Sequence, residues 1–161
     1  MSEMHTTVNG ASCGSIARNK ELAREWFLHI STGNLDGLRA MTSENWVMVG
    51  GPPDLPSGHE GIRVLFEHIG EIDQTWTIND VIAENDKVVV RATNTCVQES
   101  FFGVPGAGIT QVFSATFILQ FADGLVINTW RNAADLQRLL QLGARILPPT
   151  DTDTQPTARA E

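Results

Sequence analysis

The sequence predicts an α+β fold, in which a curved antiparallel sheet wraps around N-terminal helices as a barrel or cone and encloses an apolar pocket. Apolar residues recur mainly at helical spacing through residues 16–69, whereas β-rich runs fill residues 75–131. Helices and strands that segregate along a chain in this way are typical of α+β folds. The interior of such a cone is a natural small-molecule site.

Helices dominate the first half of the chain. Residues 16–32 carry an apolar stripe at helical spacing, and Gly33 is expected to end that helix. The elements expected next are a helix capped by Asn34 and running to about Met41, a strand at 46–49, a breaker-rich loop at 50–58 and a helix at 59–69.

Strands dominate the second half. In order, we expect strands at 75–83 and 87–99 joined by a turn at Asn85–Asp86, a loop at 101–108, a strand from Ile109, a turn at 122–124, a strand ending at Arg131 and a helix at 133–142. The Gly-containing turn between two β-rich runs is a strong hairpin signal.

This hairpin carries a charge on its most apolar face. The expected register pairs Phe117 with Thr129 and Ala115 with Arg131. Because side chains alternate along a strand, Arg131 shares its face with Phe113, Ala115, Phe117, Leu119, Ile127 and Thr129. A cation that faces aromatic rings must reach solvent, find a partner or meet a ligand. A salt bridge to Asp135 is the structural alternative to a role in function.

Composition predicts one domain at residues 16–147 between disordered tails at 1–15 and 148–161. The formal net charge of −8 among 161 residues argues against a nucleic-acid or anionic-membrane partner. Two cysteines, Cys13 and Cys96, do not make a disulfide framework and favour reduced thiols. No signal peptide or membrane span is evident, so we expect a cytoplasmic protein.

Other side chains are candidates for the pocket or for an interface. No two of the four histidines have metal-ligand spacing, so no metal site is expected. Arg91, among valines, either orients a substrate or pairs with an acidic neighbour. Trp130 is expected on the opposite sheet face beside Val126 and Ile118, which favours a homodimer through that face. The candidate substrate-binding residues are Phe113, Phe117, Trp26, Met48, His29, Arg91 and Thr129.

Four segments carry a family resemblance. They are the apolar pattern of helix 16–32, GHEGIRVLFEHI after the Pro-rich loop, FFGVPGAG before the long strand, and ADGLVINTW followed by DLQRLLQLGA. In this order the chain resembles the SnoaL-like polyketide cyclase family over residues 16–147. The resemblance implies a cone of the nuclear transport factor type that acts on aromatic polyketides of bacterial antibiotic pathways. Family cyclases close a ring by intramolecular aldol condensation without metal or cofactor.

The resemblance also implies that the acid/base pair of a cyclase is missing. Family cyclases place an Asp directly after the hairpin-strand Trp and a His on the preceding strand. Aligned on Trp130, these positions hold Arg131 and Phe117 here. Arg stays protonated and cannot act as a base, but it can stabilise an enolate or phenolate. Loss of acid/base groups, typically worth about 10²–10⁴-fold, would be severe for a cyclase.

We therefore expect a tailoring enzyme of anthracycline-type aromatic polyketides in the hydroxylase-like branch, without bound metal, flavin or haem. Arg131 is the expected catalytic residue and would hold the substrate oxyanion. O2 would be the co-substrate, and a reduced substrate or a partner reductase would supply two electrons. One alternative is an aldol cyclase with its base relocated to Asp135 or His29. Another is a non-catalytic small-molecule-binding module, since this fold hosts many of those.

Overall fold

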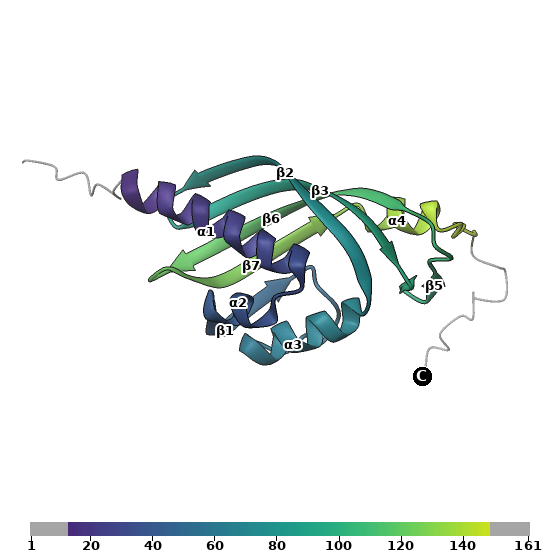
Figure 1. Ribbon diagram of the computed structural model, residues 1–161, viewed down its shortest axis with the longest axis horizontal. Helices are drawn as coiled ribbons and strands as arrows, with labels where there is room; N and C mark the ends of the chain where they lie inside the picture. The colour runs from purple at the N-terminus through teal and green to yellow at the C-terminus, as the bar shows by residue number, and fades with distance from the viewer. Residues whose placement is uncertain (1–12, 149–161) are drawn as a thin grey trace, which may run out of the picture.

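The computed structural model describes residues 13–148, which form a curved five-stranded sheet crossed by helix α1 (Figure 1). In chain order the elements are α1 (Cys13–Thr32), α2 (Leu35–Ala40), β1 (Thr42–Val49), α3 (Gly58–Ile69), β2 (Ile72–Glu84), β3 (Lys87–Gln98), β4 (Ser100–Phe101), β5 (Val104–Pro105), β6 (Gln111–Ala122), β7 (Leu125–Ala133) and α4 (Asp135–Gln141). No helix in this part of the chain is long and apolar enough to cross a membrane.

The sheet has the order β1-β7-β6-β3-β2. Strands β2, β3, β6 and β7 pair antiparallel, but β1 pairs with β7 in parallel, so the sheet is mixed and the expectation of a wholly antiparallel sheet was wrong. After β1, α3 carries the chain across to β2 at the opposite edge of the sheet. Strands β1 and β2 form the two edges, so the cone is open and does not close into a barrel.

The hydrophobic core fills the space between α1 and the sheet. Phe27 of α1 meets Phe117 of β6 edge to face, with ring centroids 5.1 Å apart. Val90 and Leu119 are fully buried beneath them. Burying the apolar stripe of α1 against alternate residues of β3 and β6 holds the helix across the sheet, as its sequence pattern predicted.

Several element boundaries differ from the predicted ones. Helix α1 begins at Cys13, inside the predicted N-terminal tail, while the rest of that tail and nearly all of the C-terminal one lie outside the described residues. Strand β1 begins at Thr42 rather than at residue 46. The prediction missed its first residues because exposed polar side chains there interrupt the period-two pattern. The predicted loop at 101–108 contains the short hairpin β4–β5, whose turn residues Phe102 and Gly103 both have positive φ.

The register of the β6–β7 hairpin also differs from the prediction. Phe117 pairs with Arg131, and Ala115 with Ala133, a shift of two residues. The turn has two residues rather than the predicted three, which shifts the pairing by one residue. A bulge after Gln120 shifts it by one more. Arg131 therefore keeps the face it was predicted to share with Phe117. Val126 is fully buried rather than beside Trp130, so that part of the predicted dimer patch is wrong. The homodimer itself stays a prediction.

Candidate functional site

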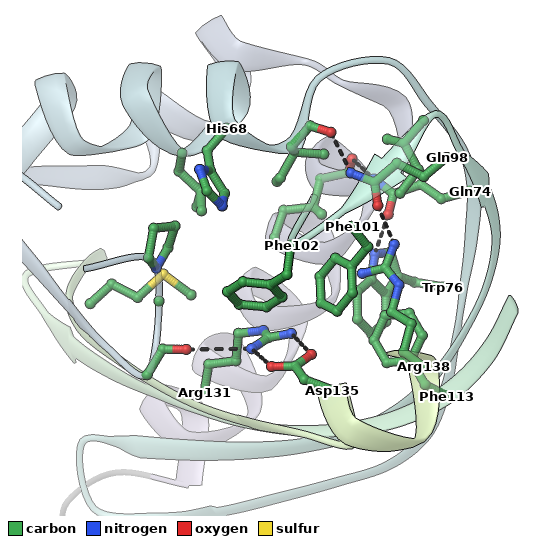
Figure 2. A pocket seen from close by; sticks show the side chains of 18 of the residues that line it. His68, Gln74, Trp76, Gln98, Phe101, Phe102, Phe113, Arg131, Asp135 and Arg138 are labelled. Atoms are coloured by element: carbon green, nitrogen blue, oxygen red, sulfur yellow. Dashed lines mark hydrogen bonds and ion pairs between the residues drawn. The ribbon is translucent and has the colours of Figure 1, made fainter. Parts of the chain in front are cut away.

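A cavity of about 310 Å³ lies between the helices and the sheet and is large enough for a small organic ligand. Its walls come from α1, α3, the sheet, the β4–β5 hairpin and α4 (Figure 2). The walls are largely aromatic, and the polar groups gather where α4 and the hairpin meet the sheet. The aromatic lining residues are Trp26, Trp76, Phe101, Phe102, Phe113 and Phe117.

The aromatic wall is a connected set of rings. Trp76 meets Phe113 and Phe117 edge to face, with centroid distances of 5.8 Å and 5.6 Å. Trp26 meets Phe117 at 6.2 Å in the same geometry. Edge-to-face contacts hold each ring in place. Such a wall presents flat, rigid apolar surfaces and suits a planar polycyclic ligand.

Arg131 and Asp135 form a two-pronged ion pair on the cavity wall. Arg131 Nη1 donates to Asp135 Oδ2 at 2.8 Å and Nη2 donates to Oδ1 at 2.7 Å. Both side chains are mostly buried, with exposed fractions of 19% and 29%. The salt bridge that the sequence left open as the structural alternative is thus formed, although Arg131 still lines the cavity.

The loop after β1 closes on this ion pair. Arg131 Nη1 lies 3.4 Å from the carbonyl oxygen of Gly50. Gly50 has a φ of +80°, and a Cβ at this position would lie 2.1 Å from the carbonyl oxygen of Arg131. Only glycine tolerates both the conformation and the close approach. Gly50 therefore allows the loop to complete the wall beside Arg131.

A second arginine, Arg138 of α4, lines the cavity and is only 5% exposed. Its Nε donates to Gln111 Oε1 at 2.6 Å, and its Nη2 bonds to Gln98 Oε1 and lies 3.4 Å from Cys96 Sγ. The guanidinium carbon lies 3.9 Å from the ring centroid of Phe101 and 4.7 Å from that of Phe113. Burial lowers the pKa of Arg138, but an arginine remains protonated at neutral pH.

His68 and Gln74 complete the polar part of the lining. His68, at the end of α3, lies across the cavity from Arg131, with Phe102 between them in the view of Figure 2. Gln74 Oε1 accepts hydrogen bonds of 3.1 Å from Trp76 Nε1 and from Asn94 Nδ2. These two hydrogen bonds orient the Trp76 ring and occupy both lone pairs of Gln74 Oε1. His68 is the titratable residue that α3 adds to the cavity.

The structure brings together five of the eight predicted site residues. The ones that line the cavity are Arg131, Phe113, Phe117, Trp26 and Met48. The other three, His29, Arg91 and Thr129, lie elsewhere, and their predicted contact with a ligand is not supported by their position.

Each of the three exceptions has a physical reason. His29 faces α2: its Nδ1 lies 3.1 Å from Asn34 Nδ2, and a Cβ at Gly37 would lie 2.5 Å from its ring. Arg91 is exposed on the outer sheet face, where it pairs with Asp80. Thr129 is buried deeper in the core and accepts a 2.9 Å hydrogen bond from the indole of Trp46.

Sequence reasoning named Asp135 of α4 but missed Arg138 of the same helix and the residues that α3, β2, β3 and the β4–β5 hairpin contribute. Hydrophobic periodicity does not mark a buried arginine, and in α4 Arg138 is buried whereas Leu136 and Leu140 are exposed. Phe101 and Phe102 were hidden within a predicted loop. Among residues 13–148, no group of three or more His, Cys, Asp or Glu side chains is placed to hold a metal ion.

Comparisons with known proteins agree with this architecture. Residues 23–129, more than half of the chain, match the family model described as a SnoaL-like domain. TsrD from Streptomyces laurentii superposes with a TM-score of 0.68 at 25% identity, covering 80% of this chain and 97% of that one. A comparison with curated protein sequences gives no match.

Two further solved structures share the fold. AclR from Streptomyces galilaeus, provisionally named a hydroxylase, has a TM-score of 0.69 at 23% identity, covering 80% of this chain and 97% of that one. A protein from Jannaschia sp. CCS1, provisionally named a SnoaL-like polyketide cyclase, has a TM-score of 0.69 at 24% identity, covering 83% and 94%. At these identities the likeness shows the fold alone, so the chemistry must be argued from the site.

Proposed function

The chain belongs to the SnoaL-like domain family, and from this membership we propose that it is a tailoring enzyme that hydroxylates an aromatic, anthracycline-type polyketide without bound metal, flavin or haem. Two kinds of chemistry are named among the similar structures, hydroxylation for AclR and polyketide cyclisation for the Jannaschia protein. The side chains in this cavity favour the first.

The observation that carries the proposal is the charge pattern of the cavity. Two guanidinium groups, Arg131 and Arg138, line it, and Asp135 is already held by Arg131 through both carboxylate oxygens. The cavity therefore combines flat aromatic walls with an excess of positive charge. A polyphenol bound as its phenolate fits both features, and cations facing the oxygen stabilise that anion.

The chemistry must balance two oxygen atoms and two electrons. Hydroxylation breaks one C–H bond, forms one C–O bond with an atom of O2 and releases the other atom as water, which consumes two electrons and two protons. A hydroquinone substrate can supply both when it is oxidised to the quinone. A partner reductase is the second possible electron source. The residues of the chain would bind and orient the electron-rich phenolate and hold its charge.

Aldol cyclisation is the second candidate, and the position of Asp135 is the observation that favours it. Asp135 lines the cavity, as a relocated base would have to, whereas His29 lies outside it. Both oxygens of Asp135 accept hydrogen bonds from Arg131, however. To take a proton from substrate, Asp135 would have to do so while held in this pair, which makes cyclisation the weaker proposal.

An isotope experiment separates the candidates. The purified protein is incubated with a tetracyclic anthracyclinone in its hydroquinone form under 18O2, with and without an NADPH-dependent quinone reductase, and product mass is followed. We expect one labelled oxygen per product molecule, above the rate without protein. Ring closure of an uncyclised precursor without O2 uptake would support the cyclase instead. Binding of both compounds without turnover would support a non-catalytic module.

Substitution of Arg131 tests the role proposed for it. Arg131→Ala should lower turnover about 10²-fold, the usual effect of losing one oxyanion donor, while Arg131→Lys should retain part of it. Arg18→Ala is the matched control, because Arg18 is exposed on α1 and does not line the cavity. Full hydroxylation by Arg131→Ala would rule out the proposed role.

A further inference from the structure

Within residues 13–148, Arg138 carries a buried charge that forms no ion pair with an acidic side chain. Of the charged residues that line the cavity, Arg131 and Asp135 cancel in their two-pronged pair. No ion pair joins Arg138 to a carboxylate anywhere in residues 13–148. One positive charge therefore remains on the lining, and it lies on the more deeply buried of the two arginines.

The hydrogen-bond partners of Arg138 are neutral. Gln98 and Gln111 offer amide oxygens, and the third partner is Cys96. Burial raises the pKa of the Cys96 thiol, so this group is uncharged at neutral pH and does not act as a counter-ion. Moving a guanidinium out of water is costly unless an anion compensates it. The neutral partners hold the group in place but leave its charge without an opposite one.

One edge of this guanidinium remains available. Nε and Nη2 are used in the contacts with Gln111, Gln98 and Cys96, whereas Nη1 makes no hydrogen bond with any residue that the structure describes. The rings of Phe101 and Phe113 pack against the group, with centroids 3.9 Å and 4.7 Å from the guanidinium carbon. Nη1 is therefore the nitrogen left for a hydrogen bond to a ligand. A single nitrogen with two hydrogens suits one oxygen atom, not a two-oxygen fork.

We propose that the cavity binds its aromatic ligand as an oxyanion and that Arg138, through Nη1, holds the anionic oxygen. The oxygen is that of a phenolate or one oxygen of an aryl carboxylate, which share this chemistry. Arg131 faces the ligand as a second guanidinium, as in the proposed function, but Asp135 balances its charge, so Arg138 supplies the net charge. Identification of this ligand with the substrate rests on the proposed function, but the preference for an anion does not.

A pair of probes that differ in charge tests the preference. Binding of anthraquinone-2-carboxylate and of anthraquinone-2-carboxamide is measured by calorimetry at pH 7.5. The wild-type protein should bind the carboxylate at least about tenfold more tightly, the usual range for a charge-assisted hydrogen bond. In Arg138→Met the ratio should fall to about one, with Arg138→Lys in between. Arg18→Met makes the same change of charge outside the cavity and should keep the wild-type ratio.

A spectroscopic readout separates phenolate from carboxylate recognition and from a merely structural role. The phenol of 1,2-dihydroxyanthraquinone changes colour on deprotonation, so its pKa can be followed while bound. Binding to the wild-type protein should lower that pKa by about one unit, equivalent to a tenfold preference for the phenolate. Binding to Arg138→Met should not lower it. A shift without carboxylate preference would identify the phenolate as the recognised anion.

Results with the wild-type protein decide the matter even if Arg138→Met fails to fold. Equal affinity for the two anthraquinone probes, together with an unshifted phenol pKa, would overturn the proposal. An anion preference without 18O incorporation would leave this inference standing and remove the hydroxylase. Incorporation of 18O without an anion preference would overturn this inference and leave the proposed hydroxylase standing.

Discussion

Arg131 and Asp135 link the end of β7 to the first turn of α4 through parallel hydrogen bonds of 2.8 Å and 2.7 Å. The pair is mostly buried, so it is less screened than a surface ion pair. It also orients α4, the helix that carries Arg138. The pair therefore contributes to the site twice, as part of the wall and as the anchor of the second arginine.

Asp135→Asn distinguishes a supporting carboxylate from a catalytic base. Asparagine has nearly the same shape and keeps one acceptor for Arg131. We expect hydroxylation to remain within about tenfold of wild type, whereas removal of a general base would cost about 10²–10⁴-fold. Turnover under 18O2 is the measurement, with circular dichroism to confirm folding. A loss of the larger size would make Asp135 a catalytic residue.

Gly50→Ala should destabilise the protein by about 2–4 kcal/mol, because the new Cβ meets the backbone of Arg131 and φ is unfavourable. Gly33→Ala is the matched control: its φ is also positive, at +66°, but nothing lies within 4 Å of the added Cβ. That variant should lose only about 1 kcal/mol. Urea unfolding gives both free energies. Equal losses would mean that the close approach at Gly50 contributes nothing.

Thr129→Val should lower stability without changing ligand affinity. The substitution conserves shape but leaves the buried Trp46 Nε1 without its acceptor, at a cost of about 1–3 kcal/mol. The dissociation constant for anthraquinone-2-carboxylate should stay at the wild-type value, because Thr129 does not line the cavity. In a Trp46→Phe background the same change should cost less, since no donor is then stranded. An unchanged cost there would contradict the hydrogen-bond explanation.

The buried Cys96 thiol should make stability fall at alkaline pH. Burial raises its folded-state pKa above the unfolded value of about 8.5. The unfolded chain therefore releases this proton first as pH rises. The contribution to stability is complete below about pH 8.5 and declines as pH rises toward the folded pKa.

Urea unfolding at pH 7.5 and 9.5 measures this effect, in a Cys13→Ala background so that one thiol titrates. Over this range the Cys96-containing protein should lose up to about 1 kcal/mol more than Cys96→Ala. Identical losses in the two proteins would show that the thiol is not the source of the decline.

The cavity face of the hairpin could be predicted from the sequence even though its register could not. The shorter turn and the bulge after Gln120 each shift the pairing by one residue, and a shift of two preserves the alternation of faces. Arg131 therefore still shares a face with Phe117. Val126 lies between the turn and the bulge, so its pairing is shifted by one residue only. Its side chain therefore changes face and points into the core.

The contribution of α4 could not be predicted by the same reasoning. Hydrophobic periodicity assumes that a helix buries its leucines, but α4 buries Arg138 and exposes Leu136 and Leu140. What decides its orientation is the tertiary contact of Asp135 with Arg131 and of Arg138 with Gln98. The pairing of Asp135 with Arg131 could be anticipated from their spacing of four residues, but Gln98 lies 40 residues from Arg138, and local sequence carries no record of that contact. The prediction that His29 contacts a ligand is unsupported for a related reason, because α2 approaches closely at Gly37 and covers the His29 ring.

The wall beside Arg131 joins positions 81 residues apart, where Gly50 meets the guanidinium. The aromatic rings of the cavity come from residues 26–117, and the two arginines follow them in the chain, on β7 and α4. Without β7 and α4, the rings of Trp76 and Phe113 would have no arginine beside them to balance an anionic ligand. Binding of an aromatic anion would therefore report that β7 and α4 are packed against the earlier elements that carry the rings.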